Sequence, residues 1–313
     1  MITHVLRASF RYIVTGSRTR RPTSRRREAY VTDLQVPEEF PGFYDAFAIG
    51  LSYTSRLHQD NLPPPPKNWR EMQSHPQKGF LDAANREISE LQGKETFKYV
   101  ERPKGTQIVP LLWVFVYKFD KDGFLVKYKS RLCVRGDKQR LTLKDTYAAT
   151  LTAKVFRAMM AITAAFDLET NQYDVQNAFP HCDLDEVVYY ECPEGFGQTG
   201  MCILLLKALY GLRRAPRLWQ QKLISRLNQL GLRQVADESC LFVSQALILI
   251  FFVDDIITMF HREFRSQAIA LKTALTEPFD IKDLGELKWF LGVRVVRDRP
   301  NRKLWLCQDS YVD

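Results

Sequence analysis

Two adjacent carboxylates, Asp254 and Asp255, interrupt an otherwise almost wholly apolar run over residues 247–260. Burying an ionised acid without a partner is costly, and hard oxygen donors offset that cost by binding Mg²⁺, which takes one or two carboxylates together with substrate phosphates. A surface turn is the competing interpretation, because Asp is a common turn residue. Taken alone, the pair leaves metal chemistry and a plain turn equally open.

A third acid, Asp174, ends a short strand-like segment that follows an Ala-rich helical stretch. The apolar residues of that stretch recur at helical spacing, at Val155, Met159, Ile162 and Phe166. A strand-end acid and a hairpin pair can meet in space. Three carboxylates from two β elements are what a two-metal phosphoryl-transfer site requires, so the sequence predicts that these acids converge.

A β-hairpin is predicted upstream, where residues 108–119 and 124–134 are β-rich runs joined by the turn sequence DKDG. Alternation along the second run places three basic residues on one face, Lys127, Lys129 and Arg131. The opposite, packing face carries Val126, Tyr128 and Leu132. One face is therefore basic, although a solvated edge strand blunted by lysines is the alternative.

Two further helices are predicted, over residues 80–92 and from Pro216 to a stop at Gly231. The second has an apolar stripe of Trp219, Leu223, Leu227 and Leu230. Three arginines lie at its start, Arg213, Arg214 and Arg217. Because the positive end of the helix dipole disfavours them there, we expect an anion such as a phosphate beside them.

The bulk composition predicts a folded, soluble protein rather than a membrane or disordered one. The chain has 313 residues, 45% of them hydrophobic, and no run approaches the roughly 18 apolar residues that cross a bilayer. Residues 1–30 hold eight Arg and one Glu, which accounts for most of the net charge of +9. The remaining basic residues bunch over 127–140 and 207–226, a density that suits phosphate binding, although solvated faces are the usual alternative.

The chain divides at a proline run, residues 63–66, which predicts a basic, disordered arm and linker over 1–66 and a folded domain over 67–313. The Arg-rich start also resembles a mitochondrial transit peptide, or a remnant of an upstream coding segment. The six cysteines include no C-x-x-C pair and, with five histidines, complete no zinc spacing. We expect reduced, packed thiols in an intracellular protein of the cytoplasm or nucleus.

Six blocks occur in order along the chain: KSRLCVRG (129–136), YDVQNAF (173–179), DEVVYYECPEGF (185–196), LKALYGLRRAPRLW (206–219), FVDD (252–255), and DLGE (283–286) leading into FLG (290–292). Together they resemble the Ty1/copia-type reverse transcriptases of LTR retrotransposons. The resemblance implies an α+β, right-hand polymerase fold, with an antiparallel β palm packed on helices, a β-rich fingers subdomain, a truncated thumb and no RNase H domain.

The resemblance also implies the reaction, an RNA-directed DNA polymerase that transfers a nucleotide from a dNTP to a primer 3′-hydroxyl. The implied partners are an RNA or DNA template with its primer. The catalytic acids would be Asp174, Asp254 and Asp255, which together with Val175 would hold two Mg²⁺ ions, or Mn²⁺ in their place.

Substrate-binding roles follow from the same resemblance. Lys129 and Arg131 would hold the triphosphate, and Tyr210 and Gly211 would form the template and nucleotide platform. Phe179 would be a steric gate against a ribose 2′-hydroxyl, with ordinary core packing as the alternative. The hairpin of Phe290, Leu291 and Gly292 would grip the primer, and the nucleic acid would also meet Arg213, Arg214 and Arg217.

Several positions depart from the family pattern and suggest a degenerate copy. Pro180, His181 and Cys182 stand where the family has Leu-Asn-Gly, and Phe252 replaces a tyrosine. Arg214 replaces a glutamine, and residues 147–150 have lost the usual FAPV sequence. The alternative hypothesis is therefore a catalytically lapsed remnant that acts at most as a nucleic-acid-binding protein.

Overall fold

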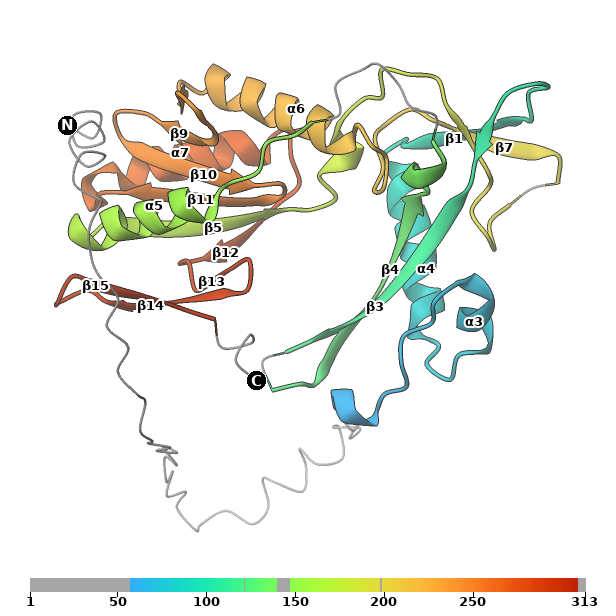
Figure 1. Cartoon of the computed structure of the whole chain (residues 1–313), viewed down its shortest axis with the longest axis horizontal. Coiled ribbons are helices and arrows are strands. Elements are labelled where there is room, and N and C mark those ends of the chain that lie inside the picture. The colour runs from blue at the N-terminus through green and yellow to red at the C-terminus, as the bar shows by residue number, and fades with distance from the viewer. Residues whose placement is uncertain (1–56, 121, 140–146, 198, 309–313) are drawn as a thin grey trace, which may run out of the picture.

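A computed structural model describes residues 57–120, 122–139, 147–197 and 199–308, so most of the predicted basic arm lies outside it. The chain mixes helices and strands in two regions that Figure 1 shows side by side. A long two-stranded ribbon and its helices form one region. A six-stranded central sheet with its helices forms the other.

The ribbon consists of β3 (Leu111–Phe119) and β4 (Leu125–Val134), antiparallel over their whole length, as the hairpin prediction required. Helix α4 (Gly79–Gly93) packs along β4, and the short helix α3 (Trp69–Ser74) precedes it. Phe80 is fully buried between the two elements, and its ring contacts those of Phe115, Tyr117 and Tyr128. The predicted packing face is wrong at Val126, which is 64% exposed: the register shifts between Lys118 and Phe119 and leaves Val126 without a cross-strand partner, so the alternation is interrupted there.

Residues 57–66 belong to the ribbon region rather than to a free linker. The Gln59 N–H donates to the Gly123 carbonyl at 2.9 Å, and the Leu125 N–H donates to the Leu57 carbonyl at 2.8 Å. Pro66 is buried. The segment therefore holds the ribbon turn, and the predicted boundary at 66 falls inside a packed structure.

A four-stranded sheet lies beside the ribbon, with the strand order β1-β7-β6-β2. Its strands are β1 (Phe97–Glu101), β7 (Met201–Leu205), β6 (Tyr189–Tyr190) and β2 (Ile108–Val109). Pro110 separates β2 from β3, because a proline has no N–H to donate to a ladder. In the chain, β1 and β2 come before the ribbon, whereas β6 and β7 follow β5 of the central sheet.

The central sheet is antiparallel throughout. Its strands, in pairing order, are β12 (Ile281–Gly285), β5 (Glu169–Val175), β11 (Asp255–Phe260), β10 (Leu247–Phe252), β9 (Glu238–Val243) and β8 (Arg233–Val235). β10 and most of β11 are buried on both faces, which explains their continuous apolar sequence. The predicted hairpin over 247–260 is confirmed.

Three helices accompany this sheet: α5 (Ala153–Ala165), α6 (Ala215–Gln229) and α7 (Arg265–Thr276). The Thr152 hydroxyl caps α5 by accepting the Val155 N–H at 3.3 Å. The predicted α6 is confirmed, with Pro216 in its first turn and Gly231 at a φ of +80° after its end. Phe166, predicted to lie in the apolar stripe of α5, follows the helix end and is 45% exposed.

A three-stranded sheet of β13 (Trp289–Phe290), β14 (Val293–Asp298) and β15 (Lys303–Cys307) completes the described chain. It lies along α5, and Asp167, in the turn after α5, accepts hydrogen bonds from Arg297 at 3.1 Å and Arg299 at 2.9 Å. All six cysteines are free, as predicted. Within the described residues, no helix combines the length and apolarity needed to span a bilayer.

Candidate functional site

The three predicted acids meet at one end of the central sheet. Asp174 on β5 and Asp255 on β11 are direct cross-strand partners, so their side chains leave the same face. Asp254 lies in the turn between β10 and β11, and its carbonyl accepts the Val175 N–H at 2.9 Å. The predicted convergence of the strand-end acid with the hairpin acids is therefore confirmed.

The turn that carries Asp254 is held from outside the sheet. Val253, its first residue, has a φ of +54°, a left-handed conformation that β-branched residues rarely adopt. The indole Nε1 of Trp219, on α6, donates to the Val253 carbonyl at 2.6 Å. Helix α6 thus fixes a strained turn at the edge of the acid cluster, which is typical of functional sites.

Crowding raises the proton affinity of the two hairpin acids. Burial, followed by the neighbouring Asp174 charge, raises the pKa of Asp254 above its ordinary value. Burial and the charges of Asp254 and Asp174 raise the pKa of Asp255 to about 6, against a hydrogen bond from the Gln172 amide at 3.4 Å. The Gln176 amide donates to Asp174. These groups are negatively charged oxygen donors whose mutual repulsion a cation would relieve.

The donor chemistry of the cluster therefore fits a divalent cation such as Mg²⁺. Among the described residues, however, no three His, Cys, Asp or Glu side chains are already disposed to hold a metal ion. The carboxylates share a backbone framework rather than a finished coordination shell. An ion would compete with the amide hydrogen bonds of Gln172 and Gln176 for the oxygens of Asp255 and Asp174.

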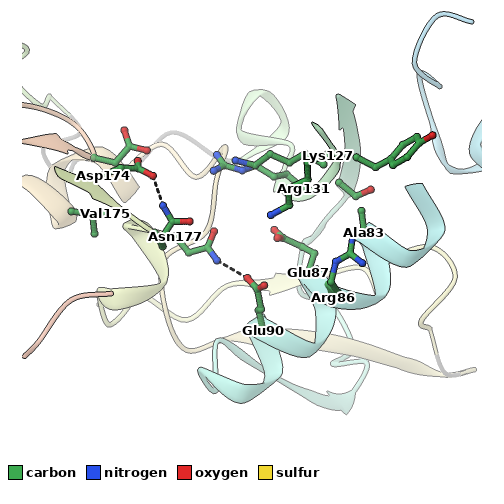
Figure 2. A pocket seen from close by; sticks show the side chains of 14 residues that line it. Ala83, Arg86, Glu87, Glu90, Lys127, Arg131, Asp174, Val175 and Asn177 are labelled. Atoms are coloured by element: carbon green, nitrogen blue, oxygen red, sulfur yellow. Dashed lines mark hydrogen bonds between the residues drawn. The ribbon is translucent and has the colours of Figure 1, made fainter. Parts of the chain in front are cut away.

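A cavity of about 160 Å³ separates the acids from the ribbon (Figure 2). Asp174 and Asp254 line one side, and the predicted basic residues Lys129 and Arg131 line the other. Figure 2 shows the Arg131 side chain extending toward Asp174. Lys127, which alternation put on the same face, lines the cavity too, as do Tyr128 and Ser130 from the other face of β4.

Helix α4 contributes residues that our sequence analysis missed. Arg86, Glu87 and Glu90 line the same cavity, together with Asn177 from the segment after β5. The Asn177 amide donates to Glu90 at 2.9 Å and so joins α4 to the central sheet region. The only signal in the sequence was two glutamates at i and i+3 on a predicted helix, a spacing that puts them on one face without saying what that face meets.

Arg131, Tyr210 and Phe179 form a stack. The Arg131 guanidinium lies 3.9 Å from the centre of the Tyr210 ring, and the Phe179 ring meets Tyr210 edge-on with centres 4.8 Å apart. Burial raises the pKa of Tyr210 to about 12. At Gly211 a Cβ would lie 2.2 Å from the Val134 carbonyl oxygen, so glycine is required where this turn crosses the end of β4. Phe179, Tyr210 and Gly211 lie behind the cavity wall rather than on it.

Two of the predicted nucleic-acid contacts are wrong. The Arg214 side chain is only 9% exposed and pairs with Asp185 at 2.6 Å, so the anion expected at the start of α6 comes from the chain itself. Phe290 is 2% exposed and packs on Phe156 with ring centres 4.9 Å apart, so its side chain anchors the hairpin internally. Neither side chain is available to nucleic acid.

The remaining predicted contacts are at least partly accessible. Arg213 donates to the Gly136 carbonyl at 2.7 Å, and Arg217 donates to the Gln220 amide oxygen at 3.5 Å. Leu291 is 50% exposed, and Gly292 is exposed beside it. Both have positive φ, 49° and 78°, and form the tight turn between β13 and β14.

Comparisons with known proteins identify the family of this chain. A family model described as "Reverse transcriptase (RNA-dependent DNA polymerase)" matches residues 94–313. The retrovirus-related Pol polyprotein from transposon TNT 1-94 of Nicotiana tabacum is 36% identical over 259 residues, which are 79% of this chain and 19% of that protein.

More distant relatives give the same result. The Pol polyprotein from transposon RE1 of Arabidopsis thaliana is 30% identical over 70% of this chain and 15% of its own length. The truncated transposon Ty1-A Gag-Pol polyprotein of Saccharomyces cerevisiae is 27% identical over 66% of this chain and 18% of its own length. The chain thus spans less than a fifth of each of these proteins. It belongs to the reverse transcriptase family, as a Ty1/copia-type reverse transcriptase domain.

Proposed function

We propose that this chain is an RNA-directed DNA polymerase that extends a primer on a template with deoxynucleoside triphosphates. In this proposal the central sheet is the palm, and the ribbon with α4 is the fingers of a right-hand polymerase. The observation that carries the proposal is that Asp174, Asp254, Lys129 and Arg131 line the same cavity, with the acids facing the basic residues. Phosphoryl transfer requires mainly positioning and charge stabilisation, and these two walls supply opposite charges for both.

Each wall has its own role in the proposed reaction. The primer 3′-hydroxyl attacks the α-phosphate of the nucleotide, and pyrophosphate leaves. Asp174 and Asp254 would hold two Mg²⁺ ions, with the Val175 backbone beside them and Asp255 in support. Bound in this way, the ions would favour the attacking alkoxide and neutralise charge on the leaving oxygen. Lys129 and Arg131 bind and orient the triphosphate from the opposite wall.

Residues beside the cavity support its basic wall, and a turn of the C-terminal sheet is proposed to contact the primer. Phe179 is 8% exposed and lies behind the cavity wall, so the core-packing alternative suits it better than a gate against the ribose 2′-hydroxyl: it packs edge-on against Tyr210, and Tyr210 in turn supports Arg131. The exposed turn of Leu291 and Gly292 is the proposed contact to the primer. Because Phe290 anchors this turn beneath α5, the contact would be made by backbone and by Leu291 rather than by the phenyl ring.

The test is primer extension on an RNA template with Mg²⁺, comparing the chain with Asp254→Asn. Removing one of the ion-binding carboxylates should lower incorporation by at least about 100-fold, the order typical of a lost transition-state contact. Asp237→Asn, the same change in the exposed turn between β8 and β9, is the control and should retain incorporation. Equal incorporation by Asp254→Asn and the unaltered chain would refute the site assignment.

One other result has a defined meaning. RNA binding that weakens with salt, without any incorporation by the unaltered chain, would support the lapsed remnant, because phosphate contacts alone give salt-dependent affinity.

The departures from the family pattern at residues 180–182 are compatible with the fold, since Pro180 occupies the start of the short helix η3 (Phe179–His181). The substitutions therefore do not by themselves exclude turnover.

A further inference from the structure

Glu87 is a buried carboxylate that the proposed reaction does not use. It lies on the inner face of α4, is 8% exposed, and lines the cavity beside the basic residues of β4. Its Oε1 atom accepts a long hydrogen bond, 3.4 Å, from the N–H of Leu132. Leu132 directly follows Arg131 on β4, so the bond holds the carboxylate beside this part of the ribbon. A buried ionised acid needs opposite charges nearby, and one weak hydrogen bond does not supply them.

Two cations of the ribbon supply that charge. Lys129 and Arg131 lie two residues apart on one face of β4, so their charges repel each other. Burial raises the pKa of Glu87, whereas the charges of Arg131 and Lys129 oppose that rise. The Arg131 Nε atom is buried without a hydrogen-bond partner in the described part of the chain, so the guanidinium is held by the Tyr210 ring and by charge.

The charges around the cavity balance. Four basic side chains line it, Arg86, Lys127, Lys129 and Arg131. Four acidic side chains line it too, Glu87, Glu90, Asp174 and Asp254. Asp174 and Asp254 lie where cations are proposed to bind, and Glu90 is engaged by Asn177. Glu87 is therefore the acid left to balance the ribbon cations.

We propose that Glu87 is a positioning residue for the polyphosphate of the incoming nucleotide, one that holds the side chains of Lys129 and Arg131 in the cavity by its charge. This inference rests on the proposed function. Removing the carboxylate would leave two like charges side by side on β4, free to separate or, for the lysine, to lose its proton. In either case one charge-assisted contact to the phosphates is lost.

The surroundings of Lys129 give this role a pH signature. The groups that face Lys129 are Lys127 and Arg131 on β4, Lys118 on β3, Glu87 on α4 and Asp254 in the opposite turn. Burial and the neighbouring Arg131 charge lower the pKa of Lys129, and Glu87 is the acid that raises it. Replacing Glu87 by Gln should therefore make Lys129 lose its proton at lower pH.

The experiment measures equilibrium binding of a dNTP with Mg²⁺ to the chain on a template with a dideoxy-terminated primer, from about pH 7 to about pH 10. Termination prevents turnover, so binding is read without chemistry. We expect Glu87→Gln to weaken binding roughly tenfold, the loss for one charge-assisted contact, and to shift the alkaline loss of binding to lower pH. Glu90→Gln, three residues along the same helix face, should leave that alkaline loss in place.

Lys129→Arg completes the design, because arginine keeps its proton over this range. The pH shift caused by Glu87→Gln should vanish in the Lys129→Arg background. Lys129→Arg alone must also abolish the alkaline loss of binding, a test that stands even where Glu87→Gln does not fold.

Two results would overturn the inference while leaving the proposed function intact. Tighter dNTP binding by Glu87→Gln would mean that the carboxylate only repels the phosphates. A pH profile unchanged by Glu87→Gln would mean that it does not act through Lys129. Failure of the unaltered chain to bind any dNTP on the primed template would instead refute the proposed function, and this inference with it.

Discussion

At the scale of single residues, the acid cluster is electrostatically unfavourable until something positive binds it. Asp174 and Asp255 face each other across a strand pair, and Asp254 adjoins them in the turn. A protein keeps such an arrangement for function rather than for stability, since like charges placed directly opposite destabilise a sheet. The neighbouring glutamines only partly compensate, each with one amide donor.

Asp255 gives a test with a defined direction. Its pKa is raised to about 6 from an ordinary value of 3.8, so without divalent ions the stability contributed by its proton is present below about pH 4 and is lost as the pH rises through 6. We expect Asp255→Asn to melt a few degrees higher than the unaltered chain above pH 6 in EDTA, and at the same temperature near pH 4.

Asp237→Asn is the control for that measurement, because it makes the same chemical change in the exposed turn between β8 and β9. Added Mg²⁺ should reverse the order at neutral pH, since ligand binding stabilises the unaltered chain more than a variant with fewer donors. An Asp255→Asn variant that melts lower than the unaltered chain in EDTA above pH 6 would contradict the charge argument.

At the scale of elements, α6 determines the geometry of the acid turn. Trp219 is 1% exposed on the inner stripe of the helix, and its indole N–H reaches the carbonyl of the left-handed Val253. The start of the helix is anchored by the buried Arg214 side chain, which pairs with the more exposed Asp185. The helix therefore acts as a rigid support for a turn that the strands alone would not hold in this conformation.

Trp219→Phe tests this support because it keeps an aromatic ring and removes the indole donor, together with part of the buried ring volume. We expect the free energy of unfolding to fall by about 1–2 kcal/mol, the cost of one unsatisfied buried carbonyl. Incorporation should fall by about tenfold or more, because small displacements of catalytic groups are costly.

Trp113→Phe is the matched control. Its indole N–H donates to the Glu194 carbonyl at 3.2 Å, and neither residue lines the cavity, so the same chemical change should lower stability and leave incorporation of the folded protein intact. Equal losses of incorporation in both variants would show that the Trp219 bond has no specific role in the turn.

At the scale of the whole molecule, the C-terminal strands are attached to the rest by charge. Asp167 has a φ of +50°, and its carboxylate accepts hydrogen bonds from Arg297, Arg299 and, at 3.3 Å, Arg262. Although burial opposes it, the hydrogen bond from Arg299 lowers the pKa of Asp167. Arg297 and Arg302 also donate to the carbonyls of Thr163 and Ala165 at the end of α5, where cations suit the helix dipole.

Asp167→Asn should therefore loosen the β14–β15 hairpin. We expect the free energy of unfolding to fall by about 2 kcal/mol, since removing one partner leaves poorly compensated arginines of which Arg297 is only 11% exposed. Amide hydrogen exchange should accelerate over residues 293–307 and stay unchanged in β10. Glu169→Gln, whose partner Arg265 is 64% exposed, is the control and should have a smaller effect. Uniform acceleration in both hairpins would contradict a local attachment.

Sequence patterns predicted most of the elements and the meeting of the acids. The β10–β11 hairpin, the ribbon and α6 follow from apolar periodicity and turn chemistry, which are local properties. Arg214, Phe290 and Glu87 were misassigned or missed because their environments depend on which distant segments meet. An arginine before a helix resembles a phosphate contact until Asp185, far away in the chain, proves to be its partner.

The direct pairing of Asp174 with Asp255 makes the site sensitive to chain length rather than only to residue identity. Side chains alternate between the faces of a strand, so inserting or deleting one residue within β5 or β11 would turn one of these acids toward the opposite face. Copies that have accumulated substitutions can still carry an intact constellation, whereas a single in-frame codon gained or lost in either strand would dismantle it.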